Sequence, residues 1–148
     1  HSEPSERLTA MTAKDRFCIL IEELVQQFEA GLQGTEWVTR RYPKKLRDDD
    51  RRLFETPALY LQKGTIKLLL DPIGYDVPEA EAAADVYQLP VYDPAARLYF
   101  ENGRWTVDLT LEPGDDVPSP PKLSSLPLTP ATINQILDTI AEYAVPAF

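Results

Sequence analysis

The sequence predicts an α+β fold: an antiparallel meander sheet of about five strands, with an amino-terminal and a carboxy-terminal helix packed on one face. Three features carry this prediction: an Asn-Gly hairpin at 98–111, an amphipathic segment near each end, and short alternating segments separated by turn residues. The length of 148 residues fits one α+β domain over 12–148, preceded by a disordered or tag-derived tail over 1–11.

The first helix is predicted to begin at Thr12, which is a capping residue. Gly31 and Gly34 indicate where it ends. Its apolar side chains recur at helical spacing and predict the buried face: Phe17, Leu20, Ile21, Leu24 and Phe28. Cys18 lies beside this stripe. We expect a structural thiol there, because the predicted fold contains no histidine to activate it.

The segment 40–52 holds seven basic residues and three aspartates and has a net charge of +4. Since the whole chain has a net charge of −9, the remaining residues carry a net charge of −13. A short helix is predicted over 45–55. The candidate basic patch consists of Arg40, Arg41, Lys44, Lys45 and Arg47. Nucleic-acid contact through this segment, with Trp37 and Tyr42 stacking on bases, is one alternative. A solvated, salt-bridged helix face is favoured, because the aspartates 48–50 would repel phosphate.

Two hairpins are predicted. In the first, over 57–70, a Lys63-Gly64 loop would place Leu59 opposite Leu68. In the second, the Asn102-Gly103 turn places opposite each other the residues whose numbers sum to 205. All large aliphatic side chains of that hairpin then share one face, and both charge pairs on the other face have opposite signs.

Between the hairpins we expect a turn at 71–74, an acidic loop at 75–81, a helical turn at 80–84 and a strand at 85–91. The segment 112–128 is proline-rich and predicts an extended connector. It is interpreted as a strap across the fold, with its P-x-x-P spacing at 118–121 as a weak alternative signal for docking to another protein. Thr129-Pro130 then starts the last helix.

Several chemistries are missing from the residues. His1 is the only histidine and Cys18 the only cysteine, which removes histidine-based catalysis and cysteine-rich zinc sites. The sequence contains neither of the glycine-rich phosphate-binding motifs, G-x-x-x-x-G-K-[ST] and G-x-G-x-x-G. We therefore expect a non-catalytic domain without a cofactor, in an accessory, inhibitor or immunity-like role.

The expected site lies in the loops of the meander, where tyrosines stand beside acids. The candidate partner-binding residues are Tyr75, Asp76, Glu79, Tyr87, Tyr92 and Asp93. The partner is expected to be a protein, and the acidic balance favours a basic one; a homo-oligomer stays open. The alternative is a divalent-metal-dependent hydrolase whose metal ligands are Asp71, Asp85 and Asp93. The single cysteine, the polar amino end and the absence of a membrane-length apolar run favour a cytoplasmic protein.

Overall fold

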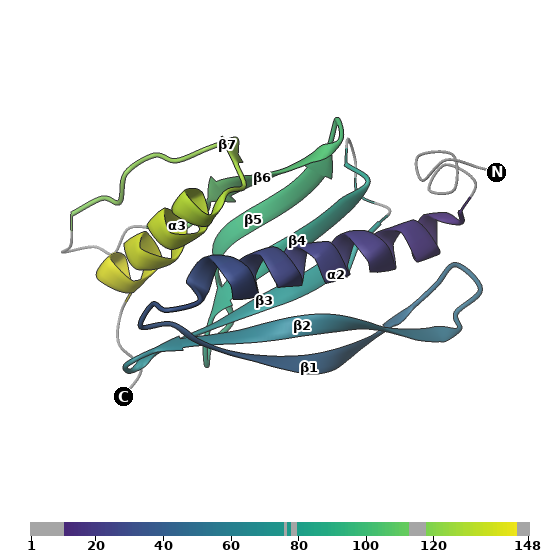
Figure 1. The fold of residues 1–148 in the computed structure, drawn as a ribbon, viewed down its shortest axis with the longest axis horizontal. Helices are drawn as coiled ribbons and strands as arrows, with labels where there is room; N and C mark the ends of the chain where they lie inside the picture. The colour runs from purple at the N-terminus through teal and green to yellow at the C-terminus, as the bar shows by residue number, and fades with distance from the viewer. Residues whose placement is uncertain (1–10, 76, 78–79, 113–117, 145–148) are drawn as a thin grey trace.

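The computed structural model describes residues 11–75, 77, 80–112 and 118–144. They form a seven-stranded antiparallel sheet in which every strand lies beside its neighbour in sequence, with two helices across one face (Figure 1). The α+β meander with both helices on one face is confirmed, although the strands number seven rather than about five.

The helices and strands follow the chain without a crossover. The helices are α2 (Ala13–Leu32) and α3 (Pro130–Tyr143). The strands are β1 (Val38–Arg47), β2 (Leu53–Lys63), β3 (Ile66–Gly74), β4 (Ala82–Gln88), β5 (Asp93–Glu101), β6 (Arg104–Leu109) and β7 (Leu126–Pro127). Neither of these helices is long and apolar enough to cross a membrane.

Helix α2 begins where its capping residue predicts. The Thr12 hydroxyl accepts the Asp15 N–H at 3.2 Å, and all five predicted stripe residues are buried. At the other end Gln33 is the C-cap, and Gly34 has a φ of +79°, a left-handed conformation that suits glycine. The helix therefore lays one continuous apolar stripe on the sheet.

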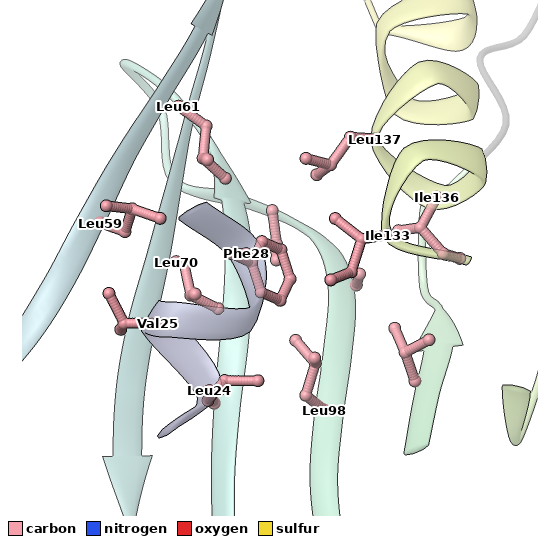
Figure 2. Close-up of a cluster of buried hydrophobic side chains, with 14 of the residues drawn as sticks. Leu24, Val25, Phe28, Leu59, Leu61, Leu70, Leu98, Ile133, Ile136 and Leu137 are labelled. Atoms are coloured by element: carbon pink, nitrogen blue, oxygen red, sulfur yellow. The ribbon is translucent and has the colours of Figure 1, made fainter. Parts of the chain in front are cut away.

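The core lies between the helices and the sheet. Figure 2 shows Phe28 of α2 and Ile133 of α3 directed towards strand residues such as Leu70 and Leu98. The helices meet at Gly31, where a Cβ atom would stand 3.3 Å from the Pro130 Cα. The absent side chain thus permits the close approach of α2 to α3.

The Asn102-Gly103 hairpin has the predicted register. Strands β5 and β6 pair from Ala96–Leu109 to Glu101–Arg104. Asn102 and Gly103 have φ values of +53° and +78°, as a type I′ turn requires. This hairpin is confirmed residue by residue.

The other hairpin is displaced by two residues. Leu59 lies opposite Leu70, not Leu68, and the loop is Gly64-Thr65 instead of Lys63-Gly64. Gly64, with a φ of +59°, takes the left-handed position that a lysine would fill at a cost. Because the displacement is an even number of residues, the predicted faces are preserved.

The predicted helix over 45–55 is wrong. These residues form the turn end of the β1–β2 hairpin, with Leu46 opposite Phe54. The Asp48 carboxylate accepts the N–H groups of Asp50 and Arg52, both at 2.9 Å. This local side-chain-to-backbone bonding stabilises a turn in competition with a helix.

Two further local predictions are also wrong. Residues 71–74 continue β3 instead of turning, and residues 82–84 belong to β4 instead of a helical turn. Pairing across this part has a register shift between Pro72 and Gly74, so the chain accommodates its proline with an irregularity in the ladder.

The described residues of the proline-rich connector lie across the fold as the predicted strap does. Leu123, Leu126 and Leu128 pack against the core, and the Leu109 N–H donates to the Leu123 carbonyl at 2.8 Å. Thr129 then caps α3 in a reciprocal capping box with Thr132. Residues 113–117 and the predicted tail residues 1–10 lie outside the described residues.

Candidate functional site: a tyrosine-bearing sheet face

The sheet face opposite α2 and α3 is not covered by either helix (Figure 1). We call it the tyrosine face. Strand alternation places Tyr60 there, since its neighbours Leu59 and Leu61 belong to the helix-side core. Four of the chain's seven tyrosines alternate onto this face, and a fifth joins it by ring contact with one of them: Tyr42, Tyr60, Tyr87, Tyr99 and Tyr92.

The rings are arranged in two contacting pairs. Tyr42 and Tyr60 stack with centroids 4.8 Å apart and an interplanar angle of 28°. Tyr87 and Tyr92 meet edge to face at 5.9 Å. Between the pairs, Leu69 lies opposite Tyr60 on one side and opposite Tyr87 on the other. Leu69 is only 2% exposed, so neighbouring side chains shield it without a covering helix.

An ion pair with a buried carboxylate holds Tyr87 of the second ring pair. The Asp85 carboxylate accepts from Arg97 Nε at 2.6 Å and Nη2 at 2.9 Å, and from the Tyr87 hydroxyl at 2.9 Å. Burial and the bond to Asp85 raise the pKa of Tyr87 to about 12. The same carboxylate raises the pKa of the Arg97 guanidinium. Tyr87 is therefore a neutral hydrogen-bond donor in a fixed orientation.

A second ion pair lies beside the first. Asp71 faces Asp85 across β3 and β4, and Lys44 reaches it from β1 with Nζ 2.6 Å from Oδ1. The same Nζ donates to the Pro72 carbonyl at 2.9 Å. Two facing carboxylates would repel each other, but here each has its own cation.

These contacts bear on the metal alternative. Asp71 and Asp85 are neighbours, but both are engaged by cations, and Asp93 stands at the start of β5 opposite Gln88. In the part of the chain that the structure describes, no three His, Cys, Asp or Glu side chains gather in a way that could hold an ion. The geometry thus adds no support to a metal-dependent hydrolase.

The predicted partner-binding residues are separated by the fold. Tyr87 and Tyr92 are together, with Asp93 next in sequence. Tyr75 packs its ring against the core residue Phe17 with centroids 5.6 Å apart, which places it with the helix-side core. Asp76 and Glu79 lie outside the described residues.

The basic patch is dispersed over an edge strand, and its cations have different partners. Arg41 is held by Glu22 and Glu29 of α2, at 2.7–3.0 Å. Lys44 is bound to Asp71, and Arg47 donates to a backbone carbonyl in its own hairpin. Charged side chains on an edge strand also discourage pairing with other chains. Three of the five patch residues, Arg41, Lys44 and Arg47, thus have structural roles in their own chain.

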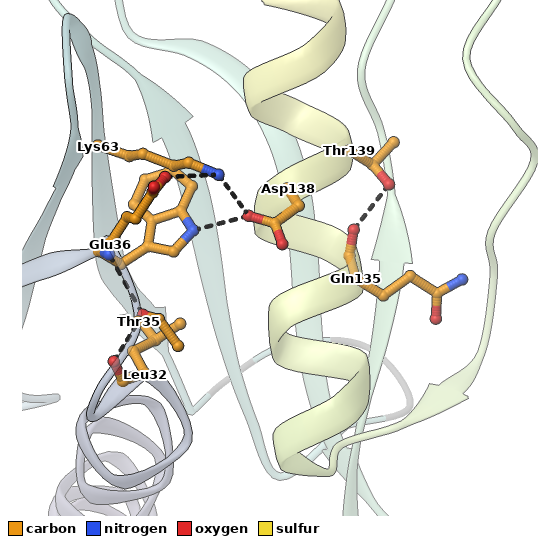
Figure 3. Close-up of polar contacts among 8 residues, drawn as sticks. Leu32, Thr35, Glu36, Lys63, Gln135, Asp138 and Thr139 are labelled. Carbon is orange, nitrogen blue, oxygen red and sulfur yellow. Dashed lines mark hydrogen bonds and ion pairs between the residues drawn. The ribbon is translucent and has the colours of Figure 1, made fainter.

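Trp37 does not join Tyr42 in a stacking surface. It is 5% exposed, and its Nε1 donates to Asp138 of α3 at 3.0 Å (Figure 3). Lys63 donates to the same carboxylate at 3.2 Å and also lies near Glu36. This group connects α3 to the sheet and is not available to stack on bases.

Cys18 is half-buried. Burial, and then the nearby Asp15, raises the pKa of its thiol. The side chain is therefore held in its weakly nucleophilic thiol form, in line with the structural interpretation.

Sequence reasoning missed Tyr60 and Tyr99 as site residues and considered Tyr42 only for stacking on bases. The signal for Tyr60 was present, because it stands between the buried residues Leu59 and Leu61. Tyr42 gave no such signal, because its neighbours Arg41 and Pro43 are exposed. Comparison with protein-family models, with curated proteins and with solved structures finds no match to this chain.

Proposed function

We propose that the chain is a non-catalytic domain that binds another protein through the tyrosine face. One observation carries the proposal: five of the seven tyrosines gather on or beside the sheet face that the two helices leave uncovered. Tyrosine combines a large apolar ring with a polar tip, and it is enriched where proteins bind proteins.

Several of these side chains are held in fixed orientations, which supports a role in binding. Tyr42 and Tyr60 are fixed by mutual stacking, and Tyr87 by its bond to the buried Asp85. Side chains that are already ordered lose less rotamer freedom on association, so more of the contact energy appears as affinity. Tyr92, 56% exposed, offers the most accessible ring of the two contacting pairs.

The role that fits this proposal is an accessory, inhibitor or immunity-like domain acting in the cytoplasm. Support for a non-catalytic role comes from the state of the side chains that catalysis most often uses. The described part of the chain contains no histidine, the lone thiol is not activated, and the facing carboxylates of Asp71 and Asp85 are neutralised by cations.

Photo-cross-linking tests the proposal. Benzoylphenylalanine would replace Tyr60 or Tyr92 on the tyrosine face, and Gln27 on the exposed side of α2 as a matched control. In the source cells, positions 60 and 92 should capture the same protein, and position 27 should not. Capture at position 27 equal to that at the tyrosine positions would count against this face.

A further inference from the structure

We infer that the protein bound by the tyrosine face presents carboxylates among apolar side chains, and that Arg40 and Lys67 receive those carboxylates. The inference rests on the proposed function and specifies its partner. The inferred partner is acidic, whereas the total charge of −9 favours a basic partner. The difference arises because the local charges of this face differ from those of the whole chain.

Three acidic groups of the tyrosine face are already engaged, and a fourth, Glu101, lies opposite Arg104 at the end of β5. Asp71 is bound by Lys44 and Asp85 by Arg97. Asp108 accepts the Ser125 N–H at 2.6 Å. At Asp71 and Asp85 a basic partner would therefore have to displace ion pairs that already exist, and this substitution would bring little net energy.

Three exposed cations of the same face, Arg40, Lys67 and Arg104, form no ion pair within the described residues, and Arg104 lies opposite Glu101 at the turn end of the β5–β6 hairpin. The Arg40 guanidinium lies over the Tyr60 ring, 4.9 Å from its centroid. Stacking fixes the guanidinium plane and leaves its N–H edge free for a planar carboxylate.

Arg40 and Lys67 flank the first ring pair. Arg40 is opposite Tyr60 across β1 and β2, and Lys67 is opposite Gln62 across β2 and β3. Since neighbouring strands are about 4.8 Å apart, the two backbones lie roughly 10 Å from each other with Tyr60 between them. A partner that contacts the Tyr42–Tyr60 pair with apolar side chains can thus place carboxylates on either side.

The total charge does not prevent this. At physiological salt the Debye length is about 8 Å, so the acidic groups on the helix side of the molecule act weakly across the sheet. Two copies of the face would bring Arg40 and Lys67 towards cations of the same kind.

Three synthetic twelve-residue peptides test the inference. Each repeats a four-residue unit, X-Trp-X-Leu, in which X is glutamate, glutamine or lysine. Binding is measured by calorimetry at 50 and 150 mM salt, and the bound face is identified from amide chemical shifts. The glutamate peptide should bind at least tenfold more tightly than the lysine peptide, with shifts centred on Tyr60 and Leu69.

Charge reversal provides the matched comparison. The double variant R40E/K67E should lose at least tenfold in affinity for the glutamate peptide and gain affinity for the lysine peptide. The control R52E/K122E has the same net charge with both changes elsewhere, at exposed positions, and should bind as the wild type does. Equal losses in both double variants would overturn the inference, because total charge would then explain the effect.

The remaining outcomes are equally decisive. Tighter binding of the lysine peptide, or equal binding of all three, refutes an acidic partner while leaving cross-linking at positions 60 and 92 to judge the proposed function. Tighter binding of a twelve-residue oligothymidylate than of the glutamate peptide would favour nucleic acid. Concentration-dependent dimerisation that Y60K abolishes would favour a second copy.

Discussion

Asp85 and Arg97 occupy facing positions on β4 and β5, and the guanidinium holds the carboxylate with hydrogen bonds of 2.6 and 2.9 Å. The two residues of this ion pair differ in solvent exposure. Asp85 is 3% exposed, whereas 43% of the Arg97 side chain remains accessible. The carboxylate has lost its water and depends on Arg97 and Tyr87 for its solvation.

Replacing Arg97 with methionine should therefore destabilise the fold by about 2–4 kcal/mol, because a buried carboxylate loses its cation. Urea denaturation at pH 7 measures this free energy of unfolding. Adding D85N to R97M should recover at least half of the loss, since an amide costs less to bury than a charge. A loss under about 1 kcal/mol for R97M would indicate that Tyr87 alone satisfies Asp85.

Tyr87 should make stability fall at high pH. Its folded-state pKa is raised to about 12 from an ordinary value of 10, so unfolding in this interval releases a proton. The contribution of Tyr87 is fully present below pH 10 and is lost as the pH rises towards about 12. Y87F lacks this proton, so its unfolding free energy should decline less than that of the wild type between those pH values. Parallel curves across the interval would contradict the assignment.

Thr56 offers a stabilising substitution. It is 2% exposed, and its Oγ1 has no hydrogen-bond partner among the described residues. T56V keeps the shape and removes the unsatisfied hydroxyl, so it should stabilise the protein by about 1 kcal/mol. Thermal unfolding measures the change. T56S retains the hydroxyl and loses a methyl group, and it should lower the melting temperature. A melting temperature for T56V below that of the wild type would reveal a hidden partner for the hydroxyl.

Gly103 and Gly74 form a matched pair. An added Cβ would meet nothing within 4 Å at either position, but only Gly103 has a positive φ, +78°. G103A should therefore cost about 1–2 kcal/mol through backbone strain, whereas G74A should be within about 0.5 kcal/mol of the wild type. Denaturant midpoints for both variants test the turn. Equal effects would mean that the type I′ geometry is not what limits this hairpin.

The hairpins show what local sequence can predict. Asn102-Gly103 specifies its turn uniquely, and the facing residues then follow by counting. The segment Lys63-Gly64-Thr65 does not specify a single turn, because the glycine can be the first or the second residue of a two-residue loop. The loops Gly64-Thr65 and Lys63-Gly64 differ in strand register by two residues. Hydrophobic alternation cannot separate them, because both preserve the same faces.

The error at 45–55 has a different cause. Leu46, Leu53 and Phe54 have a spacing compatible with one side of a helix, but Asp48 bonds to two backbone N–H groups and stabilises a turn. Leu46 and Phe54 then reach the core from facing strands. Apolar spacing alone does not distinguish these arrangements in a short segment.

The candidate site was only partly predictable for a third reason. Tyr87 and Tyr92 are close in sequence and were identified together. Tyr42 and Tyr60 join them through the registers of four successive strands, and the wrongly predicted helix over 45–55 overlaps two of these, β1 and β2. Errors in register accumulate across a sheet, so a surface that spans it cannot be assembled from separate local patterns.

The strictly sequential order of the strands has a consequence for how the chain folds. From β1 to β6 each strand pairs with the next one along the chain, so this part of the sheet can form hairpin by hairpin with short loop closures. Contacts between the helices require much longer closures: Asn134 reaches the Gly31 carbonyl across 103 residues. Because loop entropy opposes such contacts until the intervening chain is ordered, α3 should dock after the sheet has formed. In native-state hydrogen exchange, α3 should correspondingly open at a lower free energy than the central strands β3 and β4, so the helix can leave the sheet while the sheet itself stays paired.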